Sequence, residues 1–203
     1  MSHDMSNADG RNRMSERKQQ ILQTAIDIIV EQGYGSLSMR ALARASGLKL
    51  GALQYHFPTW EDMLRAMVGY ISEEYQKIFE SMSVEKESLG INEFMDLLGT
   101  EPAGGALQVD RLWPQLWAMG QVKPLVADLV DEIYARYMQI LEELLEAAGS
   151  ESPRAEAICL MSVVEGSILF LSDGKRWHGD AGAVQKKLRD FIDAKYGKDD
   201  RLE

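Results

Sequence analysis

The spacing of the apolar residues constrains the fold of this chain most, because it follows the period of an α-helix wherever it is regular. Leu22, Ala25, Ile26 and Ile29 stand at i, i+3, i+4 and i+7, the pattern of a helix with one apolar face. No stretch alternates apolar and polar residues around an Asn-Gly or Asp-Gly turn, so the sequence predicts no sheet. The predicted fold class is all-α.

Capping residues and helix breakers divide the chain into about nine predicted helices. Gly33 and Gly47 are placed where a helix ends, Ser38 and Thr59 where one begins, and Pro124 in a first turn, where proline is tolerated. The predicted ranges are 14–32, 39–45, 49–56, 60–82, 91–99, 105–119, 122–148, 153–172 and 180–196.

Composition narrows the class of protein. The single cysteine, Cys159, allows no intrachain disulfide, and the polar N-terminus and the lack of a long apolar run predict neither a secretory signal nor a membrane span. We therefore expect a cytoplasmic protein without a membrane partner. The charge of −10 is uneven, since residues 1–60 hold seven Lys/Arg against five Asp/Glu and residues 61–203 hold fifteen against 27. A basic end on an acidic body fits a DNA-binding head, although an acidic protein with another role fits the charge as well.

Two short predicted helices, 39–45 and 49–56, are joined through Gly47 and preceded by a longer helix. This is the order of a helix-turn-helix, in which small residues let the helices approach and the second helix enters the major groove of DNA. Many helical hairpins share this spacing, so the spacing alone leaves DNA binding open.

The residues themselves resemble a known signature. Residues 37–64, LSMRALARASGLKLGALQYHFPTWEDML, resemble the TetR family of repressors, and residues 21–39 resemble the first helix of that family and the turn after it. The resemblance implies a flexible arm (1–13), a three-helix DNA-binding domain (14–75, motif 38–57) and a larger helical body for ligand binding and dimerisation (76–203). The matching positions are Ser38, Leu42, Ala43, Gly47, Gly51, Leu53, Tyr55, His56, Phe57, Glu61 and Leu64.

The same resemblance implies a role for each residue of the motif. Ser38 and the amide of Met39 would hold a phosphate, and Arg40 would contact the DNA backbone or a base edge. Lys49, Leu50 and Gly51 would open the recognition helix, Gln54 would face the groove, and Tyr55 and His56 would hydrogen-bond phosphates. Two alternatives stay open, that Tyr55 is an aromatic at the edge of the core and that His56 ends the helix. Trp60 stands where the family usually has lysine.

The body offers candidates for a ligand site and a dimer interface. Residues 157–171 are apolar nearly all the way round, which predicts a helix buried on more than one side; the resemblance places the ligand on one side and a second copy on the other. Glu165, in the middle, would either bind a cationic ligand or be paired within the core or across the dimer. The aromatic candidates, for which core packing is the alternative, are Phe94, Trp113, Trp117, Tyr137 and Phe170.

A second resemblance is looser. Residues 112–145 resemble the body of regulators related to the choline-responsive repressor, which implies a quaternary amine or a polyamine as ligand. The many methionines would equally suit a large apolar ligand. No phosphate-binding loop, nucleophile elbow or metal-ligand spacing is present, and the three histidines are far apart in sequence. We therefore predict a non-enzymatic regulator without metal or cofactor.

The implied function is that of a homodimer bound to palindromic double-stranded operator DNA. It would be a repressor released when a small-molecule effector binds the body. The alternatives are a regulator that acts without ligand or activates transcription, and a helix-turn-helix used for protein contact.

Overall fold

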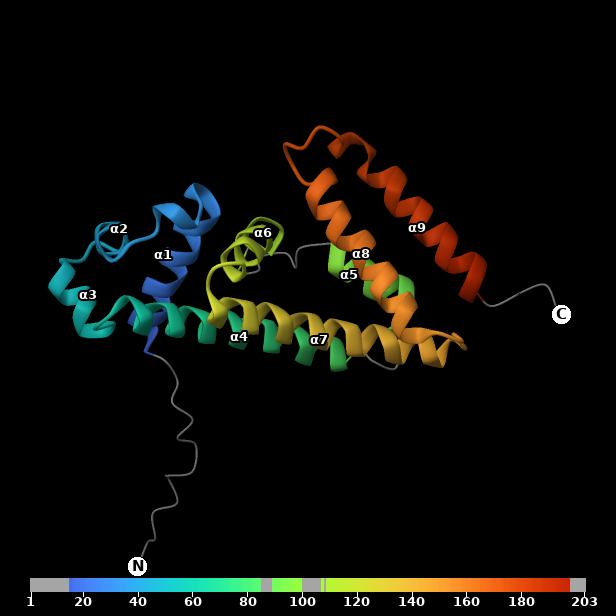
Figure 1. Cartoon of the computed structure of the whole chain (residues 1–203), viewed down its shortest axis with the longest axis horizontal. Coiled ribbons are helices and arrows are strands. Elements are labelled where there is room, and N and C mark those ends of the chain that lie inside the picture. Colours follow the sequence, from blue (N-terminus) through green and yellow to red (C-terminus); the bar gives the residue numbers. More distant parts are fainter. Residues whose placement is uncertain (1–14, 85–88, 100–106, 108, 198–203) are drawn as a thin grey trace, which may run out of the picture. The chain divides into compact units, whose positions relative to one another are not determined.

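The computed structural model describes residues 15–84, 89–99, 107 and 109–197, and these contain nine α-helices and no strand (Figure 1). The all-α prediction is therefore confirmed for this part of the chain. The helices are α1 (Glu16–Gln32), α2 (Met39–Ala45), α3 (Leu50–His56), α4 (Trp60–Val84), α5 (Ile91–Gly99), α6 (Val109–Gly120), α7 (Pro124–Ala147), α8 (Pro153–Leu171) and α9 (Ala181–Tyr196).

The predicted caps explain several helix ends. Gly33 ends α1 at a φ of 81°, a conformation that glycine adopts without strain, and the Ser38 side chain accepts a hydrogen bond from the amide of Ala41 at the start of α2. Thr59 and Asp62 form a reciprocal box: the Asp62 amide donates to Thr59 Oγ1 over 3.0 Å, and the Thr59 amide donates to the Asp62 carboxylate over 3.2 Å.

Four helices begin later than predicted. Ser15 is the N-cap of α1, for which the sequence predicts a start at residue 14. Lys49 and Lys123 have extended backbones and precede α3 and α7 as their N-caps. The helical backbone conformation is disfavoured at Lys123 because Pro124 follows it. Asp180 ends a 3₁₀ turn, His178–Asp180, before α9. The predicted arm, 1–13, and the predicted start of the helix 105–119 lie outside the described residues, and α6 is described from Val109.

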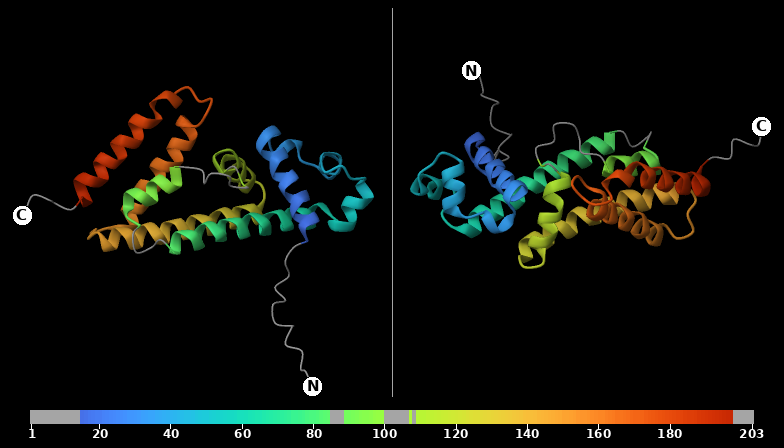
Figure 2. Two further views of the ribbon diagram at one scale, coloured as in Figure 1. Left: turned by 180° about the vertical axis from the view of Figure 1, so that it is seen from behind. Right: turned by 90° about the horizontal axis from the view of Figure 1, so that it is seen from above.

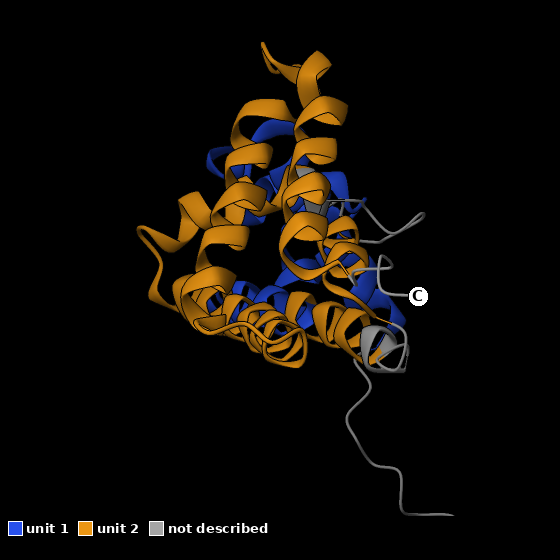
Figure 3. Ribbon diagram, turned by 90° about the vertical axis from the view of Figure 1, so that its right-hand side faces the viewer, with its two compact units in different colours: residues 1–70 blue, residues 71–203 orange. Residues whose placement is uncertain are grey.

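Two compact units divide the chain at residues 70 and 71, within α4 (Figure 3). In the first unit, α1, α2, α3 and the first part of α4 enclose a small apolar core. The Tyr70 hydroxyl donates to the Gln23 side chain over 3.1 Å and so ties α4 to α1. The core includes Ile21, Leu22, Ile26, Ile29, Leu42, Leu53, Met63 and Met67, all with no exposed surface.

In the second unit α7 contacts α5, α6 and α8, and it lies beside the second half of α4 (Figure 2). Tyr137 of α7 packs against Phe79 of α4 with a centroid distance of 4.9 Å. Helix α9 is attached to α5 by polar contacts: Arg189 pairs with Asp96 at 2.8 Å, and Asn92 donates to Asp193 over 2.6 Å. None of the described helices has both the length and the apolar character to cross a membrane.

Candidate DNA interface and ligand cavity

The turn between α2 and α3 is held from both sides. Gly47 adopts a φ of 66°, which an L side chain rarely adopts, and the Leu48 amide donates to the Ala43 carbonyl over 2.8 Å. From α1, the Arg17 guanidinium donates to the Ser46 carbonyl over 3.2 Å. These bonds fix how α3 follows α2, which a helix-turn-helix needs in order to present its second helix rigidly.

Helix α3 has one buried side and one exposed side. Leu53 is fully buried, and Phe57, just after the helix, is nearly so. Gly51, Gln54 and Tyr55 are exposed, and Tyr55 exposes 86% of its surface, so it is not part of the core. Its ring stands edge-on against the half-buried ring of His56 at 5.5 Å. The exposed side therefore offers an amide, a phenol and an imidazole in adjacent positions.

The remaining predicted DNA contacts lie at the start of the two short helices. Ser38 and Arg40 are exposed and Met39 is half-buried at the start of α2, while Lys49 is exposed and Leu50 half-buried at the start of α3. Because the Ser38 oxygen accepts from the Ala41 amide, its hydroxyl hydrogen can donate to another group. Trp60 is half-buried as the first residue of α4.

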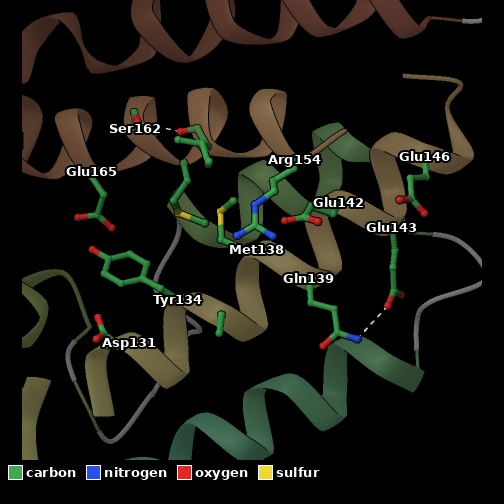
Figure 4. A pocket seen from close by; sticks show the side chains of 13 residues that line it. Asp131, Tyr134, Met138, Gln139, Glu142, Glu143, Glu146, Arg154, Ser162 and Glu165 are labelled. Carbon is green, nitrogen blue, oxygen red and sulfur yellow. Dashed lines mark hydrogen bonds between the residues drawn. The ribbon is translucent and has the colours of Figure 1, made fainter. Parts of the chain in front are cut away.

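The second unit contains a cavity of about 870 Å³ between α7 and α8 (Figure 4). Five carboxylates and one guanidinium border it, together with a phenol, a hydroxyl and an amide. Apolar side chains line the stretch between the charged groups. The lining residues are Asp131, Tyr134, Ala135, Met138, Gln139, Glu142, Glu143, Glu146, Arg154, Ile158, Met161, Ser162 and Glu165.

Glu165 is held at one end of the cavity by two neutral donors. The Trp113 indole donates to its carboxylate over 3.2 Å, and the Tyr134 hydroxyl is hydrogen-bonded to it as well. Burial raises the pKa of Glu165 above its usual range, and the two hydrogen bonds offset part of this effect. Burial, followed by the nearby Glu165 charge, likewise raises the pKa of Tyr134, so the phenol stays protonated and can donate.

Of the six predicted ligand-binding residues, only Glu165 lines the cavity. Trp113 is 5% exposed and reaches the site through its hydrogen bond to Glu165. Tyr137 and Phe94 pack against each other in the aromatic core, with a centroid distance of 6.3 Å. Trp117 is 56% exposed on α6, and Phe170 is 49% exposed on α8, where its ring meets Trp177.

The α7 side of the cavity was not predicted from the sequence. Glu142 and Glu143 fit the description of a solvated helix face, and acidic residues on a long helix usually have that role. A signal was present, since Asp131, Tyr134, Met138 and Glu142 recur at steps of three and four and therefore share one face. Which face α8 would cover depends on tertiary packing, and local spacing does not determine it.

Metal-ligating side chains do not gather in the part of the chain that the structure describes. No group of three or more His, Cys, Asp or Glu residues within these ranges is arranged to hold a metal ion. His56 lies in α3 and His178 in the turn before α9, and His3 lies outside the described residues. The His178 ring contacts the Leu171 carbonyl at 2.8 Å, next to the end of α8.

Comparison with known proteins supports the interpretation of the first unit. The profile of the family described as bacterial regulatory proteins, tetR family, matches residues 21–67. The uncharacterized HTH-type transcriptional regulator YuxN of Bacillus subtilis (strain 168) is 32% identical over 66 residues, which are 32% of this chain and 22% of that relative. The chain thus matches about a fifth of the length of this relative. The resemblance to the tetR family is confirmed.

Solved structures extend the likeness to the body. A putative transcriptional regulator from Saccharomonospora viridis, in complex with choline, has a TM-score of 0.73 at 22% identity, over 89% of this chain and 97% of that one. A TetR transcriptional regulator from Legionella pneumophila has a TM-score of 0.67 at 25% identity, over 90% and 98% of the two chains. The arrangement of an N-terminal helix-turn-helix followed by a helical body is therefore shared with these proteins.

Proposed function

We propose that this chain, which carries the DNA-binding region of the tetR family of bacterial regulatory proteins, is a homodimeric transcription regulator that releases a palindromic operator when a small ligand binds its body. The DNA-binding domain would comprise residues 14–75 and the body residues 76–203. It would act in the cytoplasm, bind double-stranded DNA, and have no enzymatic activity, metal or cofactor.

The exposed side of α3 is the observation that carries this proposal. Leu53 and Phe57 anchor the helix in the core, while Gly51, Gln54 and Tyr55 are exposed. A helix held in this way can enter the major groove. There the Gln54 amide would pair with the N6 and N7 atoms of adenine and so distinguish one base from another, and Gly51 would let the helix approach the DNA closely.

Phosphate contacts would surround this helix and fix its position. The Ser38 hydroxyl and the Met39 amide lie at the N-terminus of α2, where helix dipole and amide donors favour an anion. Arg40, Lys49, Tyr55 and His56 would contribute further contacts to the backbone. Such contacts position the protein without selecting a sequence.

A second copy of the chain would cover the exposed apolar residues of α8 and α9. Ile192 is the buried residue of α9, whereas Phe191 is 60% exposed and Val184, seven residues earlier on the same side, is 36% exposed. On α8, Leu169 and Phe170 are 62% and 49% exposed. Paired across a dimer, these helices would form a four-helix bundle. Two recognition helices about 34–36 Å apart would then match one turn of B-DNA.

The cavity between α7 and α8 would bind the ligand. The regulator from Saccharomonospora viridis was solved with choline, and a cation also suits the five carboxylates bordering this cavity. Helix α4 contributes residues to both units, so a ligand that shifts α4 would change the spacing of the recognition helices. Repression relieved by ligand is the mechanism we propose; activation and action without ligand are its alternatives.

Selection from a pool of random DNA duplexes tests this function, because such a pool contains every candidate operator. The purified chain should enrich one inverted repeat with half-sites about one helical turn apart. A chain carrying Gln54→Ala and Tyr55→Ala should enrich none. If the wild-type chain retains DNA without enriching any sequence, it is not a site-specific regulator.

A further inference from the structure

The cavity between α7 and α8 is elongated, because its lining follows two neighbouring helices (Figure 4). On α7 it extends from Asp131 to Glu146, which lie about 22 Å apart along the helix axis at 1.5 Å per residue. On α8 it extends from Arg154 to Glu165. The hydrogen bond between Tyr134 and Glu165 places the start of the α7 stretch beside the end of the α8 stretch.

Charge collects at the two ends of this cavity. We call the end formed by Asp131, Tyr134 and Glu165 the first pole. The second pole contains Glu142, Glu143 and Glu146, with Arg154 as the one cation of the lining. Between the poles the lining is mostly apolar, with Ala135, Met138, Ile158 and Met161. The cavity thus has a negative charge excess at each end and a soft, polarizable surface between them.

The first pole suits a positively charged group. Glu165 is only half exposed, and its two hydrogen-bond donors, Trp113 and Tyr134, are neutral groups. They fix the carboxylate in place without cancelling its charge. A carboxylate withdrawn from water is stabilised by a cation, so an ammonium group entering the cavity would gain a fixed acceptor here.

We propose that this cavity binds a linear polyamine, with a terminal ammonium group at each pole and the aliphatic segments across the methionines. A secondary ammonium in the middle of the chain, as in spermidine, would lie near the side-chain oxygens of Gln139 and Ser162, which also line the cavity. The proposal rests on the ligand-binding role proposed above and specifies the chemical class of the ligand. A compact monocation such as choline would occupy one pole and leave the excess negative charge of the other pole unbalanced. A ligand with two charged ends satisfies both poles.

The spacing of the poles sets the length of the ligand. Tyr134 and Glu142 are eight residues apart, which is a little more than two turns of α7, or about 12 Å along the helix axis. An extended chain advances about 3.6 Å for every three bonds, so spermidine, with nine bonds between its terminal nitrogens, spans about 11 Å. Putrescine, with five, spans about 6 Å by the same measure. Spermidine should therefore reach both poles and putrescine only one.

Isothermal titration calorimetry of the full chain with spermidine, putrescine and choline tests this proposal. Spermidine should bind at least about tenfold more tightly than either of the others. Glu165→Gln and Glu142→Gln, one at each pole, should each weaken spermidine binding by about tenfold or more, the range expected for losing a charge-assisted hydrogen bond. The matched control, Glu151→Gln, removes an exposed carboxylate outside the cavity and should leave the Kd within twofold.

The proposal is overturned if the wild-type chain binds spermidine no more tightly than putrescine or choline. It is also overturned if Glu165→Gln and Glu142→Gln leave the Kd for spermidine unchanged, as the Glu151→Gln control should. The DNA selection described above separates this outcome from a failure of the proposed function. A chain that selects an operator yet does not discriminate among the amines is a regulator with another ligand. A chain that binds spermidine at both poles yet selects no DNA has the site but not the function.

Discussion

Glu165 combines a fixed geometry with an unfavourable environment for its charge. Trp113 donates to it over 3.2 Å and Tyr134 is bonded to it, yet burial still raises the pKa of the carboxyl. Because the folded-state pKa lies above that of the unfolded chain, the folded protein holds the proton more tightly. The associated stability is complete below the unfolded-state pKa and is lost as the pH rises through the folded-state value.

Glu165→Gln should remove this loss of folding stability at higher pH. Without ligand, the melting temperature of the variant should exceed that of the wild type at neutral pH, and the difference should disappear as the pH falls to about 4.5, the ordinary pKa of a glutamate. Because the side chain is half exposed, solvent screens its charge and the gain should stay below about 4 °C. Thermal unfolding followed by circular dichroism at a series of pH values measures it.

The matched control Glu151→Gln replaces an exposed carboxylate outside the cavity, and its melting temperature should match that of the wild type throughout the series. A melting temperature for Glu165→Gln that stays at or below the wild-type value throughout the series would mean that the carboxylate is stabilised in the unliganded protein. Its role at the first pole would then need another explanation.

Among the helices, those with local end signals could be predicted from sequence. Ser38, Thr59 and Gly33 act on their own helix, so their caps follow from neighbouring residues. Pro124 likewise begins α7 because its ring suits the first turn. The exposed side of α3 was expected from the family signature, because that signature lies within one short stretch of the sequence.

The candidate ligand cavity could be predicted from the sequence only at Glu165. A charged residue within an apolar helix is visible in sequence, whereas the α7 side of the cavity depends on how α7 and α8 pack. Trp113 is 5% exposed and Trp117 is 56% exposed, although residues four apart lie on the same face of a helix. The difference in exposure arises from packing between helices, which cannot be predicted from a local sequence pattern.

Helices α8 and α9 present apolar side chains that a soluble monomer would leave in water. Phe191→Glu should convert the proposed dimer into a monomer. A carboxylate buried without a partner costs several kcal/mol, on the order of the stability of a modest interface. Sedimentation velocity at micromolar concentration would show the change. The matched control, Val122→Glu, places the same charge at a residue 69% exposed in the turn before α7 and should remain dimeric. If both variants sediment as the wild type does, α9 is not in the interface.

At the scale of the whole molecule, the proposed regulator couples two sites in separate units. Linkage requires that a ligand which weakens operator binding is itself bound less tightly by the DNA complex. The charge distribution supports this division of labour, since the carboxylates that suit an amine lie in the acidic body and the exposed polar residues of α3 lie in the basic N-terminal region. The proposed regulatory function depends first on whether α3 binds a specific DNA sequence.

Fluorescence anisotropy on the selected duplex and on a scrambled duplex of the same composition tests that claim most directly. The wild-type chain should bind the selected duplex far more tightly, with an affinity that falls as salt rises. Gln54→Ala with Tyr55→Ala should reduce this affinity by at least about tenfold, whereas Gln32→Ala, at the end of α1, should not. Equal and weak binding to both duplexes, unchanged by the double substitution, would contradict the assignment of α3 as a recognition helix.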